Sequence, residues 1–259
     1  MQLQHATYEE DAMKRNVRMW QAVVVVIGLM VAVATADASE RRAGIVDPGQ
    51  QYFGMSYNEL VSEWTNWLVA EPMATNPAFD TDGSFCEKNQ KGKVWFLAST
   101  FEGVVDRTCK VPAGKAIFFS LGGVFLSFSP EYPDPINPPN NPCVNLATVI
   151  DKIRCDASLT VPLASSASLE VVIDGDPVKD LFAFRAQSQP GGFTLHVPEP
   201  SLLTGWGYSS GNRFPAVADG YFMFLKPLSP GKHTLNIIMT YPGQLPAGVN
   251  YTLIVPRTP

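Results

Sequence analysis

The feature that most constrains the fold of this chain is a series of short apolar runs separated by turn residues. In the C-terminal half these runs are rich in β-branched and aromatic residues, and they cover 169–173, 178–186, 193–197, 221–226, 233–240 and 251–255. Asp174-Gly175 favours a tight hairpin turn after the first run, and Gly and Pro separate most of the others. The sequence therefore predicts a mainly β protein, either an antiparallel β-sandwich or a jelly roll.

The N-terminal half adds further strands and few helices. Its strand-like runs lie at 94–97, 116–119 and 123–128. Before them, Ser56 and Glu59 form a capping-box pattern, and apolar residues recur at helical spacing down to Pro72. A shorter amphipathic segment over 146–154 predicts a second helix. We expect these one or two helices to lie at the periphery of the sheets.

Residues 1–38 have the features of a cleavable signal peptide. Lys14 and Arg15 belong to a positive segment, residues 22–36 carry no charge, and Ala36-Asp37-Ala38 offers the small residues that signal peptidase requires. A permanent membrane anchor is the alternative, but a membrane span needs about 20 apolar residues. The sequence therefore predicts an exported protein, periplasmic or extracellular, with no membrane span after cleavage.

The domain boundaries follow from these segments. Met13 is a possible true start, because Lys and Arg follow it directly. Residues 39–55 are polar and without periodicity, which predicts a flexible mature N-terminus. Residues 56–259 are expected to form a single β-rich domain. Within it, the Pro/Asn-rich stretch 130–142 predicts a surface loop or a connector between two lobes, because proline cannot donate to a central strand.

Four cysteines in the predicted mature chain indicate disulfides, since an even count in an exported protein is typical of oxidised pairs. A zinc site is the alternative, but the chain has no Cys-x-x-Cys pair. The local pairing joins Cys86 to Cys109 and Cys143 to Cys155, and two other connectivities remain open. A helix over 146–154 would hold the second pair too far apart, unless the preceding chain folds back along that helix.

Several segments resemble a group of exported bacterial proteins of unknown function. They are the W-x-x-W of 64–67, VWFL at 94–97, VPAGKAIFF at 111–119, ADGY at 218–221 and LSPGKHT at 228–234. The resemblance implies a shared fold and export. It implies no activity and assigns no functional residue.

One set of residues suggests a hydrolase. Ser209 lies in a Gly-x-Ser-x-Gly pattern, and Asp219 and His233 follow in the serine, acid, histidine order of α/β-hydrolases. The serine of such enzymes sits between a strand and a helix, whereas Phe214-Pro215 follows here and no α/β alternation exists. A glycine- and serine-rich loop is therefore the competing interpretation of this motif.

Carboxylates suggest two further kinds of site. Glu131 with Asp134, or Glu199 with Asp219, could form an acid pair for glycoside hydrolysis, but nothing in the sequence selects between them. Asp80 and Asp82 resemble the start of a calcium loop, but the later ligands of an EF-hand are missing, so a turn is the competing interpretation. The sequence predicts no other cofactor.

Trp206, Tyr208 and Phe214 form an aromatic, glycine-rich segment that could stack on a sugar ring or another apolar ligand. The alternative is that these rings cover the end of a sandwich core. Because no catalytic set is convincing, the leading functional hypothesis is a binding module for a small molecule, a glycan or a surface protein, with a secreted hydrolase as the alternative. The formal net charge of −5 argues against nucleic acid as a partner.

Overall fold

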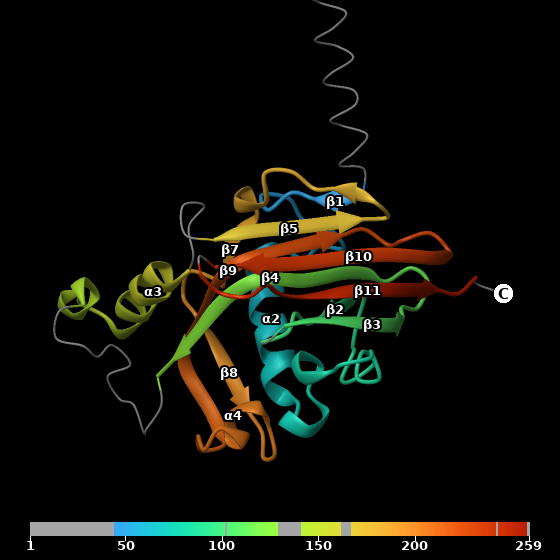
Figure 1. Ribbon diagram of the computed structural model, residues 1–259. Coiled ribbons are helices and arrows are strands. Elements are labelled where there is room, and N and C mark those ends of the chain that lie inside the picture. The colour runs from blue at the N-terminus through green and yellow to red at the C-terminus, as the bar shows by residue number, and fades with distance from the viewer. Residues whose placement is uncertain (1–43, 102, 129–140, 162–166, 242, 258–259) are drawn as a thin grey trace, which may run out of the picture. The chain divides into compact units, whose positions relative to one another are not determined.

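The computed structural model describes residues 44–101, 103–128, 141–161, 167–241 and 243–257 (Figure 1). Over these residues the protein is a two-sheet β structure with few helices, so the predicted fold class is confirmed. The predicted signal peptide and most of the Pro/Asn-rich loop lie outside the described residues. No helix within the described ranges is long and apolar enough to cross a membrane.

Two sheets contain all the strands of the described chain. The first sheet has the order β1 (Ile45–Val46), β9 (Gly211–Leu225), β4 (Ala116–Ser127) and β2 (Val94–Leu97), and β7 (Arg185–Gln187) and β8 (Phe193–Val197) also pair with β9. The second sheet has the order β3 (Val104–Lys110), β11 (Ala247–Val255), β10 (Gly231–Thr240), β5 (Ser168–Ile173) and β6 (Asp176–Pro177).

Helix α2 (Tyr57–Ala70) covers the first sheet through aromatic contacts. The ring centroids of Trp64 and Phe222 lie 5.6 Å apart, and those of Tyr57 and Phe118 lie 5.7 Å apart. Ser56 caps the helix as predicted, with both hydrogen bonds of the capping box to Glu59 present. Most buried apolar residues of α2 and of the two sheets belong to one hydrophobic core, so the helix and both sheets pack against one another.

Strand pairing is mixed rather than wholly antiparallel. β2 pairs with β4 in parallel, and β3 pairs with β11 in parallel. The order of strands along the chain explains the first case, because β2 and β4 lie in the first sheet while β3, between them, lies in the second. The chain therefore crosses to the other sheet and returns before the next strand of the first sheet begins.

Some predicted segments differ in the structure. Residues 178–186 do not return as one strand: Asp180 adopts a left-handed backbone with φ of 56°, a 3-10 helix follows over Leu181–Phe184, and β7 then pairs in the other sheet. Residues 44–55 were expected to be flexible, but β1 pairs with β9. Strand β3 was not predicted, because its alternating polar residues conceal the apolar face.

The remaining helices are short and lie outside the two sheets. A 3-10 helix at Pro142–Asn145 precedes α3 (Val149–Thr160), and α4 (Leu202–Gly205) is a further helix that the sequence did not predict. Helix α3 packs against β9. Ile153 of α3 and Val217 of β9 are buried together in a small second hydrophobic cluster. In Figure 1, α3 lies at the left beside β4 and β9, and α4 lies at the bottom, next to β8.

Both local disulfides are confirmed, with Cα–Cα distances of 5.8 Å for Cys86–Cys109 and 5.7 Å for Cys143–Cys155. The second pair was expected to be difficult because the helix was placed over 146–154. Helix α3 begins three residues later, so Cys155 lies within it, and the chain before it folds back along the helix. The amide of Asn141 donates to Asp156 Oδ1 at 2.6 Å, which holds this arrangement.

Candidate functional site

An apolar pocket of about 330 Å³ opens beside the bulge of β4. Its walls come from α2, β4, β9, the facing ends of β10 and β11, and the loop 98–101. Its deeper lining residues include Ser120 and Phe222, which are 4% and 2% exposed, while Phe101 and Leu245 at its other side are 48% and 88% exposed. The pocket therefore runs from the core to the surface of the protein.

Glycines at the bulge of β4 leave room for this pocket. The pairing of β4 with β9 shifts register between Ser120 and Gly122. A Cβ at Gly123 would lie 2.7 Å from the carbonyl oxygen of Asp219, and a Cβ at Gly122 would lie 2.4 Å from Met239 Sδ. The obstacle at Gly123 is backbone, and the φ of 148° at Gly122 favours glycine, so the bulge requires glycine at both positions.

None of the described residues that line the pocket is charged. Two of the polar groups there are already used within the fold: Thr65 Oγ1 donates to the carbonyl oxygen of Val61 at 2.7 Å, and Trp64 Nε1 donates to that of Leu97 at 2.9 Å. The pocket consequently offers an apolar surface with few hydrogen-bonding groups, as is usual for sites that bind small organic molecules.

Exposed aromatic rings continue the apolar surface at the rim. Phe101 lies between Phe79 and Trp206, with ring-centroid distances of 5.2 Å and 5.8 Å. Of the three predicted aromatics, Trp206 belongs to this cluster. Tyr208 lies instead under the guanidinium group of Arg213, and Phe214 is 61% exposed with no ring contact among the described residues.

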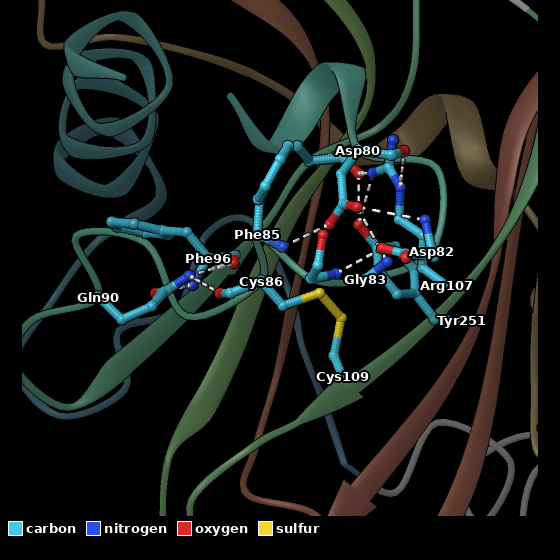
Figure 2. Close-up of a disulfide and its surroundings, with 12 residues drawn as sticks. Asp80, Asp82, Gly83, Phe85, Cys86, Gln90, Phe96, Arg107, Cys109 and Tyr251 are labelled. Atoms are coloured by element: carbon cyan, nitrogen blue, oxygen red, sulfur yellow. Dashed lines mark hydrogen bonds between the residues drawn. A yellow bond between two sulfur atoms is a disulfide. The ribbon is translucent and has the colours of Figure 1, made fainter. Parts of the chain in front are cut away.

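A buried arginine that the sequence did not single out holds one wall of the pocket. Arg107 Nη1 donates to the carbonyl oxygen of Ala98 at 2.9 Å, and its Nε donates to that of Asp80 at 2.7 Å (Figure 2). The Tyr251 hydroxyl donates to the same Ala98 oxygen at 2.6 Å, and burial raises the pKa of this phenol, so it keeps its proton. Arg107 is 1% exposed. The sequence does not reveal its buried structural role, because a charged residue in an alternating strand is usually expected on the solvent face.

Asp80 and Asp82 shape a turn in the structure. Asp80 Oδ1 accepts from the amides of Asp82 and Gly83, and its Oδ2 accepts from the amide of Phe85 at 2.9 Å (Figure 2). Asp82 Oδ1 accepts from Ser84 N. These oxygens satisfy backbone donors beside the Cys86–Cys109 disulfide. Within the described ranges, no group of three or more His, Cys, Asp or Glu side chains could hold a metal ion.

The structure does not bring Ser209, Asp219 and His233 together as a triad. Asp219 is 1% exposed, and Arg185 binds both of its carboxylate oxygens at 2.9 and 2.8 Å. Gln187 donates to the same carboxylate at 2.6 Å. These bonds occupy both carboxylate oxygens of Asp219, the candidate partner of Glu199 in an acid pair. Glu131 and Asp134 lie outside the described residues.

His233 instead lies between Asp174 and Ser229. Its Nδ1 is 2.6 Å from Asp174 Oδ2, and its Nε2 is 2.9 Å from the Ser229 carbonyl oxygen and 3.4 Å from Ser229 Oγ. Burial acts to lower the pKa of His233, but the bonds to Asp174 and to the Ser229 carbonyl outweigh it and raise this pKa. Both nitrogens face acceptors, an arrangement that favours the doubly protonated ring, and the ring links the turn at Asp174 to the turn at Ser229.

Comparisons with protein-family models, with curated proteins and with solved structures found no match to this chain. The resemblance to exported bacterial proteins therefore stays a prediction. Sequence reasoning identified Trp206 at the rim but missed the pocket itself, whose available signal was the Gly122-Gly123 pair inside an apolar run.

Proposed function

We propose that this chain is an exported binding protein that holds a small apolar molecule in the pocket beside the β4 bulge. The observation that carries the proposal is the pocket of about 330 Å³, which is lined by uncharged residues and continues into exposed aromatic rings. Large apolar side chains exposed together are unusual on a monomer without a binding role. Two disulfides support the export part of the proposal, because such bonds persist in oxidising compartments.

The alternative of a secreted hydrolase has less support. The histidine of the predicted triad donates to a carbonyl oxygen from Nε2, the atom that would have to accept the proton of a serine nucleophile. Asp219, the acid of the predicted triad, is hydrogen-bonded to Arg185 instead of to His233. Binding without turnover is therefore the function that the geometry supports best.

The test is a fluorescence titration of the purified protein with N-phenyl-1-naphthylamine, an uncharged dye that brightens in apolar surroundings. We expect saturable binding with one dye per chain. Ala247 lines the pocket, so Ala247→Trp fills it and should weaken dye binding at least tenfold. Ala70→Trp, at the end of α2 and outside the pocket lining, should leave the titration unchanged.

The outcomes separate clearly. Absence of saturable dye binding by the unmodified protein, or equal binding by the Ala247→Trp variant with its fold intact by circular dichroism, would show that this pocket is not a ligand site. Hydrolysis of ester or glycoside substrates that survives in this variant would favour the enzyme alternative.

A further inference from the structure

We propose that the pocket selects an uncharged ligand that carries an acceptor oxygen, of the ester or ketone class, and that the hydroxyl of Ser120 binds this oxygen. The inference rests on the proposed function and names the chemistry of its ligand. It follows from one buried side chain, from the lack of charge around it, and from the size of the pocket.

Ser120 presents an unused hydrogen-bond donor to the pocket. The residue lies on β4 directly before the bulge, lines the pocket and is 4% exposed. Its Oγ accepts from the amide of Gly122 at 3.1 Å. A serine hydroxyl also carries one proton to donate, and within the described part of the chain that proton has no acceptor. A ligand oxygen would satisfy it, and a buried donor without a partner is otherwise costly.

The pocket excludes charged head groups. A carboxylate or an ammonium group placed next to Ser120 would be buried, and no residue of the described lining carries a charge to compensate it. Burying an ion without a partner costs far more free energy than burying a neutral carbonyl group that accepts one hydrogen bond. The pocket therefore discriminates between an ester and the corresponding free acid.

The volume of the pocket limits the length of the ligand. A cavity of about 150 Å³ holds benzene, and this pocket is about twice that size at about 330 Å³. A linear ester with a chain of about ten carbons matches such a volume. Longer chains would extend past Phe101 to the aromatic rim.

The experiment measures how methyl decanoate, decanoate and undecane displace N-phenyl-1-naphthylamine from the protein at pH 8. We expect the ester to displace the dye at a concentration at least tenfold lower than the carboxylate. Ser120→Ala should weaken the ester about threefold to tenfold, the range for one hydrogen bond, and should leave undecane and the dye within twofold. Ser120→Cys, with a weaker donor of similar size, should fall between the two.

Ser62→Ala is the matched control, because Ser62 is a buried serine of α2 whose hydroxyl bonds to Asn58 and Gln189 away from this pocket. It should leave all three displacement curves unchanged. The inference would be overturned if decanoate bound as tightly as the ester, or if both Ser120 variants bound the ester as tightly as the unmodified protein. In either case, saturable dye binding would still support the proposed function. Absence of saturable dye binding by the unmodified protein would overturn the proposed function itself.

Discussion

Asp219 is a buried carboxylate whose charge is compensated mainly by its ion pair with Arg185, while the charge of Arg154 acts on it as well. Arg185 binds it through two nitrogens, and the hydrogen bond to Asp219 is the largest of the effects that raise the pKa of this guanidinium. The Arg185 side chain is 31% exposed while that of Asp219 is 2% exposed. Removal of the Arg185 side chain would therefore leave the buried Asp219 carboxylate charged and poorly solvated.

We expect Arg185→Met to lower the free energy of unfolding by about 3 kcal/mol, because breaking a buried pair strands the remaining charge. Urea denaturation followed by tryptophan fluorescence measures the change. Adding Asp219→Leu to this variant should restore part of the loss, since no buried charge then remains. Lys179→Met, at an exposed position, should change stability by less than about 0.5 kcal/mol. Equal stability of the unmodified protein and Arg185→Met would contradict this account.

His233 makes the stability of the protein depend on pH. Its pKa is raised in the folded state above the usual value of about 6.5. A raised pKa means that the stabilisation is complete below pH 6.5 and is lost as the pH rises through the folded-state value. Asp174 and the Ser229 carbonyl are the acceptors responsible for the increase.

We expect His233→Gln to reduce the free energy of unfolding more at pH 6 than at pH 9, because the bonds of the protonated ring contribute only at the lower pH. Urea titrations at both pH values measure the difference. Asp174→Asn removes the charged acceptor and should shrink the same pH dependence. A stability loss of equal size at both pH values would show that the histidine acts by packing alone.

At the scale of elements, the close pairing of β4 with β9 depends on the glycines where the two strands meet. Gly123 lies opposite Gly220 in the register, and a Cβ on Gly220 would lie 2.6 Å from the carbonyl oxygen of Gly122. The obstacles at these positions are backbone atoms, which cannot move aside as a flexible side chain can. The close approach of the two strands therefore depends on glycines beside the pocket, one of which, Gly123, also lines it.

We expect Gly123→Ala to destabilise the protein by about 1–3 kcal/mol, because the added methyl group forces the two strands apart. The same substitution should weaken binding of N-phenyl-1-naphthylamine, since the bulge shapes the pocket. Thermal unfolding and dye titration measure the two effects. Gly49→Ala, where a Cβ meets nothing within 4 Å, is the control and should change neither. An unfolding temperature for Gly123→Ala equal to that of the control would contradict the requirement for close pairing of β4 and β9.

At the scale of the whole molecule, the disulfides connect separate parts of the fold. Cys109 belongs to β3 of the second sheet, and its partner Cys86 lies in the segment that leads to β2 of the first sheet. The Cys143–Cys155 bond instead ties α3 to the short helix before it. The first bond therefore constrains the sandwich, and the second constrains a peripheral unit.

We expect the protein recovered from the export compartment to begin at Ser39 and to contain no reactive thiol. Intact mass measurement after alkylation without reduction tests both points in one experiment. Cys86→Ala with Cys109→Ala should lower the free energy of unfolding by about 3 kcal/mol, the size expected for a loop of this length. Thiols that alkylate fully would contradict the predicted export, and an N-terminus that retains residues 1–38 would contradict the predicted cleavage.

The local features were predictable because they depend on residues close together in the chain. The capping box at Ser56 and Glu59, the run 94–97 and the strand 193–197 all appear in the structure where the sequence places them. Strand boundaries near turns were less predictable, as at 178–186, where a left-handed Asp180 redirects the chain. Trp206 was the one predicted ligand-binding aromatic found at the pocket rim.

The sequence by itself determined that this chain folds into β layers with a capped helix, because alternation and capping arise from neighbouring residues. It left the pairing of the four cysteines open, and the structure decided it. Only the tertiary structure decided that Asp219 meets Arg185, that Asp174 meets His233, and that a pocket opens beside the bulge in the pairing of β4 with β9. These contacts join residues from different strands and turns. Their partners are selected by the packing of the whole core, which no local pattern specifies.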